Sequence, residues 1–393
     1  MVAPTAKIIC PRCFYAFPPH KLHFRCVAPT CTGREKDMLY AEASGYGITM
    51  MGRVLLPRKR GFMLRVPQEA ACDACGCISR TRLCPDCHFE LPHDVGQIDQ
   101  RSIAIIGGRA TGKTHYIASL ITRLQHEVGR NFDLAVRLLG DHTQERWERD
   151  FYTPLFVDKR VLQPNRPAEV DPQVKTPLIF RLTFDDGRYK RALNLSFFDS
   201  AGEDMTSLNT MSLQNRYILH AHGIIFLLDP LQIPSMRQKL PKANVPPVDP
   251  QASPEYIVGR LRDLFERENN VRATHKIKVP VAFTLSKVDT MFSLLDPGSA
   301  LHHPGGHSGY LDLDDVESVH TEIANYLAAW ISPNFCDIIH NNFAHYRFFG
   351  VSSLGEQPDL DNCLSHVSPL RIEDPFLWIL FRLRLVRGVT RRK

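Results

Sequence analysis

The chain has 393 residues, of which 44% are hydrophobic and 23% are charged. This composition is typical of a folded protein large enough for two or three domains, and it excludes a disordered or fibrous chain. The longest apolar run near the C-terminus, residues 376–381, is far shorter than the ~20 residues that a membrane helix requires. No apolar leader precedes Cys10, so the sequence predicts a cytoplasmic protein that does not cross a membrane.

The formal net charge of +6 is only mildly basic. The excess of Lys and Arg in the first hundred residues would vanish if eight cysteines there bound two Zn²⁺ ions as thiolates. What remains are short basic runs at 58–60 and 391–393, which are more often solvated tips than binding sites. Nucleic-acid binding is therefore not favoured by the charge.

Cysteine distribution divides the chain. Nine of the eleven cysteines lie between Cys10 and Cys87, and an apolar run that is typical of a strand begins near residue 102. We therefore expect a cysteine-rich, zinc-binding head over residues 1–100 and a second domain over residues 101–393.

Four pairs of cysteines in the head have spacings that suit a metal. Cys72-x₂-Cys75 and Cys84-x₂-Cys87 supply four thiolates, the tetrahedral set that a closed structural zinc site uses. The second expected set is Cys10, Cys13, Cys26 and Cys31. Nearby groups that could replace a thiolate are Cys77, His88, His20 and His23.

Three other interpretations compete with structural zinc. Disulfides are disfavoured because the sequence shows no secretory signal and a reducing compartment keeps thiols free. An iron–sulfur cluster also uses four thiolates, and the sequence does not exclude one. A catalytic zinc would keep one coordination position free and usually includes histidine or carboxylate, which neither set needs.

From residue 101 onward, strand-like and helix-like segments alternate, which indicates an α/β fold. Strands are expected at 102–107, 177–184, 192–198, 222–228, 279–285 and 345–351, with helices near 113–127, 206–220, 254–268, 314–330 and 372–386. Asp185-Asp186-Gly187-Arg188 is a hairpin signal, so one antiparallel pair is expected in an otherwise parallel sheet with helices on both faces. The long segments 128–176 and 231–254 are expected to be lids, insertions or mobile loops. Residues 296–309, rich in Gly, Pro and His, are expected to be a third irregular segment.

The first of these strands leads into a glycine-rich loop. Gly107-Gly108-Arg109-Ala110-Thr111-Gly112-Lys113-Thr114 matches the pattern G-x-x-x-x-G-K-[ST]. In this pattern the loop N–H groups surround phosphates, Lys113 reaches the β- and γ-phosphates, and the Thr114 hydroxyl binds Mg²⁺. The start of the following helix adds its positive dipole end. A nucleotide phosphate site is therefore predicted here.

Two later segments indicate which nucleotide. Asp199 follows the strand at 192–198 and can hold Mg²⁺, while the Gly202 N–H can sense a γ-phosphate. Ser286-Lys287-Val288-Asp289 follows the strand at 279–285. Asp289 can accept from both N1–H and the N2 amine of guanine, donors that adenine lacks, and Lys287 can lie along the base. Backbone amides of Ser352 and Ser353 could contact the guanine O6.

With these motifs in the family's order, residues 101–388 resemble a Ras-like GTPase of the TRAFAC class. The cysteine-rich head before such a domain is similar to the zinc-ribbon GTPases of bacterial conflict and signalling systems. The resemblance implies a P-loop G domain with GTP or GDP, Mg²⁺ and two Zn²⁺ as cofactors. Ser286 departs from the family's usual Asn or Thr. A switch threonine should complete the Mg²⁺ site, with Thr176 as the candidate and Thr153 as the alternative.

The same resemblance frames the catalytic question. Glu203 stands where relatives have a glutamine that orients the attacking water, and Arg109 could supply charge to the transition state or hinder that water. The leading hypothesis is a Mg–GTP switch with slow hydrolysis. Its switch segments would be residues 128–176 and 203–215, which the γ-phosphate would order, and a protein partner would bind these segments or the head. The alternatives are a nucleic-acid-binding adaptor with regulatory nucleotide and a GTP-bound scaffold that does not hydrolyse.

Two smaller features have ordinary interpretations as well as functional ones. His302, His303 and His307 could bind a metal, but histidines in a flexible loop are usually solvated. Trp378 is expected to pack the last helix on the sheet, and an exposed docking face is the alternative.

Overall fold

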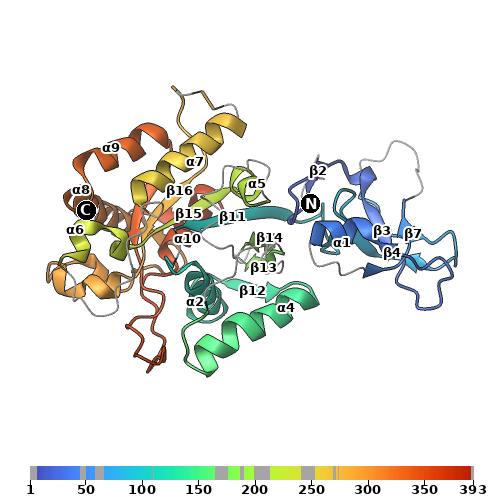
Figure 1. Cartoon of the computed structure of the whole chain (residues 1–393), viewed down its shortest axis with the longest axis horizontal. Coiled ribbons are helices and arrows are strands. Elements are labelled where there is room, and N and C mark those ends of the chain that lie inside the picture. The colour runs from blue at the N-terminus through green and yellow to red at the C-terminus, as the bar shows by residue number, and fades with distance from the viewer. Residues whose placement is uncertain are drawn as a thin grey trace.

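The computed structural model describes residues 7–44, 50–57, 66–108, 110–163, 176–185, 190–198, 213–239, 253–268, 271–272 and 274–390. Figure 1 shows the small strands that precede Leu91 at one end of the molecule and a large sheet with its helices at the other. Strand β11 (Asp99–Gly107) runs from the first part into the second.

Short strands build the cysteine-rich region. A four-stranded sheet has the order β10 (Glu90–Leu91), β9 (Thr81–Leu83), β3 (His23–Arg25) and β6 (Val54–Leu55), all antiparallel. Three two-stranded pairs accompany it: β1 (Ile8–Ile9) with β2 (Ala16–Phe17), β4 (Lys36–Asp37) with β5 (Met50–Met51), and β7 (Ala70–Ala71) with β8 (Ile78–Ser79). Helix α1 (Met38–Ser44) follows β4, and a short 3-10 turn covers Pro19–Lys21. Seven buried cysteines belong to the core of this region, and Cys75, which is only partly buried, packs against it.

The large sheet has seven strands in the order β12, β13, β14, β11, β15, β16, β18. Their bounds are β12 Leu134–Leu138, β13 Leu178–Asp185, β14 Lys190–Phe197, β15 Gly223–Leu228, β16 Val281–Leu285 and β18 Tyr346–Gly350. The five strands from β14 to β18 are mutually parallel, whereas β12 and β13 are antiparallel to their neighbours. The carboxyl ends of the five parallel strands therefore meet at one edge of the sheet.

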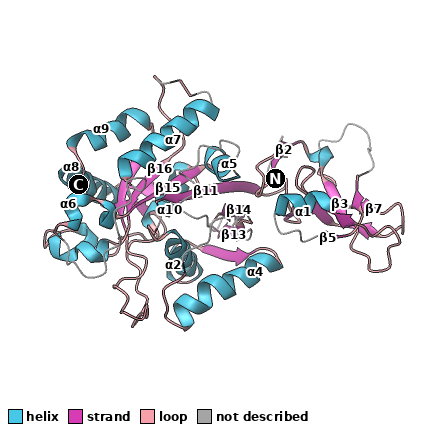
Figure 2. Cartoon of the chain, in the orientation of Figure 1, coloured by secondary structure: helices cyan, strands magenta, loops and turns pink. Residues whose placement is uncertain are grey.

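Helices cover both faces of this sheet, as expected (Figure 2). The core on one face includes residues from α2 (Lys113–Gln125), α3 (Glu127–Asn131), α4 (Asp141–Trp147) and α10 (Asp374–Arg382). The core on the other face is built mainly with α5 (Leu213–Leu219), α6 (Pro234–Arg237), α7 (Pro254–Glu268), α8 (Leu313–Trp330) and α9 (Pro333–Asn342). Alternate residues of β11 face opposite cores, so its continuous apolar run is that of a strand buried on both faces. A final short pair, β17 (Leu311–Asp312) and β19 (Gly388–Val389), joins α8 to the C-terminal residues.

The six predicted strands are all present, and each of the five predicted helices is found at least in part. The expectation of one antiparallel pair is wrong, because β12 adds a second at the sheet edge. Its side chains alternate in burial over only five residues, with Ala135 and Arg137 exposed and Leu134 buried on the opposite side. The segment 128–176 is predicted to be a lid, an insertion or a mobile loop, and its described part contains most of α3, then β12, α4 and a π-helical segment, Glu148–Val157. Trp378 is 4% exposed and packs against Phe349, which confirms its structural interpretation.

Among the described residues, Phe14 and Asp94 join the cysteine-rich region to the sheet. The Phe14 ring lies 5.5 Å from that of Phe198 and 5.9 Å from that of Tyr217, and it belongs to the core of the sheet rather than to that of its own region. Asp94 pairs with Arg181 of β13, and both are largely buried. In the described part of the chain, no helix combines the length and the apolarity that crossing a membrane requires.

Candidate functional site

The eight expected cysteine ligands form two clusters of four. One contains Cys10, Cys13, Cys84 and Cys87, and the other contains Cys26, Cys31, Cys72 and Cys75. Pairs of Sγ atoms across the first cluster are 3.7 Å apart, and those across the second are 3.7 and 3.8 Å apart. Four sulfurs at ~2.3 Å from a tetrahedral zinc ion would be about 3.8 Å apart. Both clusters could therefore hold zinc without rearrangement.

The predicted division of these cysteines into sets is wrong. The first pair in the sequence shares a cluster with the last pair, and the second pair shares a cluster with the third. The reason is the antiparallel register of β3 and β9, in which His23 faces Leu83 and Arg25 faces Thr81. Cys84 therefore continues from the end of β9 that lies beside the start of β3, whereas Cys26 continues from the opposite end.

Three of the four cysteine pairs share one backbone turn. In each, the N–H four residues after the first cysteine donates to that cysteine's carbonyl, at 2.8–3.1 Å for Gly76, His88 and Phe14. These three residues have φ values of +73°, +50° and +60°. The Arg12 and Asp86 amides donate to the Sγ atoms of Cys10 and Cys84, each at 3.4 Å. Amides directed at sulfur stabilise thiolates.

The proposed substitute ligands lie outside the clusters. His88 Nδ1 is 2.9 Å from Asp37, which also pairs with Arg25, and Cys77 is exposed. Burial and the three neighbouring thiols raise the pKa of Cys10, so four thiolates here need a cation among them. Since every position is a cysteine sulfur, the clusters have the composition of closed structural sites.

The glycine-rich loop lies where β11 ends and α2 begins. A Cβ on Gly107 would lie 2.7 Å from the Leu227 carbonyl oxygen, so β15 leaves room only for glycine. Gly112, at the start of α2, has a φ of +89° and no side chain that could occupy the first amides of the helix. Lys113 Nζ donates to the carbonyls of Gly107 and Gly108 at 3.1 and 2.9 Å, and Thr111 Oγ1 donates to Gly108 at 3.0 Å. Arg109 lies outside the described residues.

The segment that follows β16 contacts this loop directly. Lys287 has a φ of +53°, and its Nζ donates to the Ala110 carbonyl at 2.9 Å and to Asp229 at 2.7 Å. Asp229 directly follows β15 and its side chain is fully buried, so its carboxylate holds the Lys287 ammonium in place. The Ser286 hydroxyl donates to the Leu228 carbonyl at 3.1 Å, which also anchors the segment to β15.

Asp289 and Ser352 face one another. Burial raises the pKa of the Asp289 carboxyl above its ordinary value, and a hydrogen bond with Ser352 opposes that rise. Ser352 is 1% exposed, and its Oγ accepts from the Gly355 amide at 2.9 Å. The Ser353 carbonyl accepts from Ser119 of α2 at 2.7 Å. The structure thus brings the expected base-contacting residues together beside the helix that follows the glycine-rich loop.

The expected Mg²⁺ and switch residues are placed only in part. Asp199, Gly202 and Glu203 lie outside the described residues, although β14 ends at the same edge as β11 because the two are parallel. Thr176 precedes β13, which pairs with β14 in the opposite direction, so it lies toward that edge too. Its carbonyl accepts from Arg146 at 2.9 Å. The alternative, Thr153, lies in the π-helical segment, and its hydroxyl donates to Glu148 at 2.8 Å.

Two residues of this edge were not singled out from the sequence. Asp229 directly follows a buried strand, a position that could have marked it. His115 follows Thr114, and its Nε2 accepts from the Leu162 amide at 3.0 Å. Burial and the charge of Lys287 lower the pKa of His115 to about 4, so its ring is neutral and can accept.

Comparison with known proteins identifies the family. The family model described as Double-GTPase 2 matches residues 101–329, which is more than half of the chain. The chain therefore belongs to the Double-GTPase 2 family. It is also similar to a protein of Mycolicibacterium smegmatis that is named as a candidate ESX-1 scaffolding and assembly protein, SaeC. The two are 26% identical over 388 residues, which cover 94% of this chain and 97% of the relative.

The nested cysteine pairing can be tested by zinc stoichiometry. We expect two zinc ions per wild-type chain, one in the double variant Cys13→Ser/Cys84→Ser, because both residues belong to one cluster, and none in Cys13→Ser/Cys26→Ser. Native mass spectrometry gives these counts. Pairing of sequence neighbours would reverse the two double variants, so the experiment separates the two arrangements.

A second prediction concerns acid stability. The unfolded chain protonates His115 near its ordinary pKa of ~6.5, whereas the folded chain does so only at about 4. Stability is therefore fully present above pH 6.5 and is lost as the pH falls toward 4, with a contribution from His115 on the order of 1–3 kcal/mol. The melting temperature of His115→Gln, whose amide oxygen can still accept from Leu162, should fall less steeply over this window. His20→Gln, at an exposed position, should follow the wild type, and equal slopes for all three proteins would contradict the prediction.

Proposed function

We propose that this chain is a guanine-nucleotide-binding protein that binds Mg–GTP at the carboxyl edge of its large sheet and changes partner binding with the nucleotide state. The observation that carries the proposal is the contact of Lys287 with the Ala110 carbonyl at 2.9 Å. This contact joins the segment that carries Lys287 and Asp289, which would bind the base, to the glycine-rich loop, which would bind the phosphates. One nucleotide could contact both only if they lay side by side. Membership of the Double-GTPase 2 family supports the same assignment.

The phosphates would lie against Gly107–Thr114. The start of α2 has glycine at its N-cap, so its first amides can face an anion, and the helix dipole favours negative charge there. Lys113 is 9% exposed and its ammonium bonds loop carbonyls, positions close to those that β- and γ-phosphates would fill. Thr114, with Asp199 and Thr176, would hold Mg²⁺, which would neutralise charge on the phosphates.

The base would lie between the segments after β16 and β18. Guanine presents two adjacent N–H donors, and these would offset the cost of keeping the buried Asp289 carboxyl ionised. Adenine presents no such pair, so it would leave that cost uncompensated. Amides of Ser352 and Ser353 are the donors proposed for the guanine O6, and Lys287 would flank the base.

Nucleotide titration tests this assignment. Asp289→Asn should weaken GDP binding about 10–100-fold, since it replaces one charge-assisted acceptor with a neutral amide, and it should leave ADP binding unchanged. Lys113→Ala should weaken guanine nucleotides without changing the preference for guanine over adenine. Wild-type protein that binds ADP and GDP equally would overturn the base assignment.

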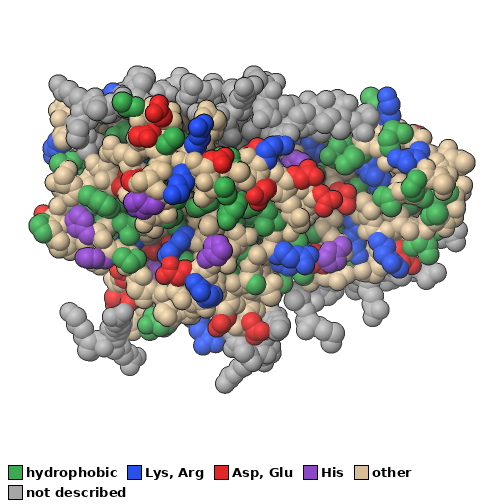
Figure 3. Space-filling model, turned by 90° about the horizontal axis from the view of Figure 1, so that it is seen from below, with side chains coloured by type: hydrophobic (Ala, Val, Ile, Leu, Met, Phe, Trp, Pro, Cys, Tyr) green, Lys and Arg blue, Asp and Glu red, His purple; other side chains and the backbone are tan. Residues whose placement is uncertain are grey.

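Turnover is a separate question. We infer slow hydrolysis, with Glu203 orienting water and Arg109 supplying charge. The name of the relative, which refers to scaffolding and assembly, favours the alternative of a GTP-bound scaffold that does not hydrolyse. That name also favours protein partners, which the switch segments or the zinc-binding region would contact. Figure 3 shows acidic and basic side chains interspersed over the described residues of one face, which offers no broad basic surface for nucleic acid there.

Single-turnover release of phosphate from GTP distinguishes these functions. We expect slow release that Glu203→Ala reduces about tenfold or more, in the range typical of lost water positioning. Glu255→Ala, an exposed substitution on α7, is the control. If the wild type retains intact GTP for many hours, the chain is a nucleotide-loaded scaffold and the hydrolysis proposal fails.

A further inference from the structure

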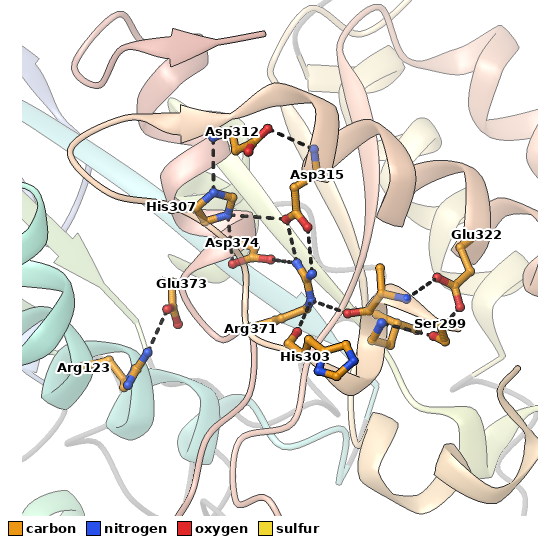
Figure 4. A network of polar contacts seen from close by, with 12 residues as sticks. Arg123, Ser299, His303, His307, Asp312, Asp315, Glu322, Arg371, Glu373 and Asp374 are labelled. Atoms are coloured by element: carbon orange, nitrogen blue, oxygen red, sulfur yellow. Dashed lines mark hydrogen bonds and ion pairs between the residues drawn. The ribbon is translucent and has the colours of Figure 1, made fainter. Parts of the chain in front are cut away.

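Arg371 is the centre of a buried polar network (Figure 4). Although it is charged, it is only 3% exposed. Its guanidinium donates to both carboxylate oxygens of Asp315 at 2.8 and 2.9 Å, and to Asp374 at 2.7 Å. Its Nε faces the carbonyls of His303 and Ala300 at 2.8 and 3.1 Å. A buried cation with this many partners holds four separate positions of the chain in place.

Those positions belong to the two segments that leave the proposed base site. After Asp289 the chain continues through a 3-10 turn, Val288–Leu294, to Ala300 and His303. After Ser352 it returns at Leu370, whose amide and carbonyl both pair with Ser352 at 2.9 and 3.0 Å. Arg371 is the next residue. Arg371 therefore follows the residue that pairs with Ser352, and its guanidinium binds the carbonyls of the segment that continues from Asp289.

The backbone at Arg371 is itself constrained. Its φ is +53°, in the left-handed region that non-glycine residues rarely adopt. Such a conformation persists where surrounding contacts fix it. Here the ion pairs of its side chain with Asp315 of α8 and Asp374 of α10 fix that conformation.

The same cluster does not fit a metal ion. His307, Asp315 and Asp374 lie close enough to share one, but the guanidinium already occupies the space between the two carboxylates. His307 accepts from the Asp312 amide at 3.2 Å and faces Asp374 with its other nitrogen, also at 3.2 Å. It is buried, so the expectation of a solvated histidine is wrong at this position.

We propose that Arg371 is a positioning residue for base recognition, which holds the Asp289 and Ser352 segments at the separation that guanine requires. This inference rests on the proposed function, and it assigns the discrimination between bases partly to a residue that does not touch the nucleotide. Glu322 supports the arrangement from α8, since it accepts from Ser299 and from the Ala300 amide.

The test compares the affinity for GDP with the affinity for IDP, which lacks the 2-amino group that Asp289 would bind. The GDP-to-IDP ratio is the ratio of these two affinities. Wild-type protein should prefer GDP about tenfold or more. Arg371→Lys retains the charge but loses the planar fork, so it cannot serve Asp315, Asp374 and both carbonyls together. Its GDP-to-IDP ratio should fall at least about threefold, because the carboxylate and the base edge no longer align. A purely structural loss of folded protein would reduce both affinities equally and leave the ratio unchanged.

Arg262→Lys is the matched control. Arg262 is 8% exposed and likewise binds a carboxylate, Glu266, and two carbonyls, those of Arg272 and His275, but on α7. Its GDP-to-IDP ratio should equal that of the wild type. If Arg371→Lys does not fold, Asp315→Asn removes part of the same network and should lower the ratio by a smaller factor.

The outcomes separate the two levels of inference. Wild-type protein without preference for GDP over ADP would overturn the proposed function itself. A wild type that prefers GDP, with an unchanged GDP-to-IDP ratio in both Arg371→Lys and Asp315→Asn, would overturn the role of Arg371 alone.

Discussion

The parallel alignment of five strands is the constraint on which the candidate nucleotide site depends. Because β14, β11, β15, β16 and β18 run in one direction, the segments that follow them leave the sheet at a single edge. Residues that are far apart in the sequence, such as Ala110, Asp229 and Lys287, are therefore within hydrogen-bond distance. The apolar runs of the central strands keep them inside the sheet, since both of their faces are buried.

The segments at this edge depend on one another. Lys287 bonds the glycine-rich loop and Asp229, Ser119 of α2 bonds the Ser353 carbonyl, and His115 accepts from Leu162. Each bond joins a loop to a neighbour that itself would contact the nucleotide or lies beside such a residue. These bonds hold the loops in fixed positions relative to one another, so the proposed phosphate and base contacts would share one set of supporting residues.

Local sequence signals predicted what local physics determines. The apolar runs of β11, β15 and β16 and the spacing of Gly107, Gly112 and Lys113 located the sheet and the loop at its edge. Strand β12 was missed because its alternation of less exposed and exposed side chains covers only five residues, of which only Leu134 is buried. The cysteine sets were missed because their pairing follows from the register of β3 with β9, a contact between residues nearly sixty positions apart. His307 was misjudged because its partner Asp374 is equally remote in the sequence.

The nested cysteine pairing also determines what each metal cluster can stabilise. The turn after Cys10 requires a left-handed residue, and that residue is Phe14, whose ring packs on Phe198 and Tyr217 of the sheet region. The cluster that includes Cys10 therefore fixes the side chain that joins the two parts of the molecule. The other cluster has Gly76 at the equivalent position, where a Cβ would have nothing within 4 Å. Because a closed metal site contributes folding energy directly, a metal ion bound by the first cluster would stabilise this junction, whereas the turn at Gly76 offers no comparable contact.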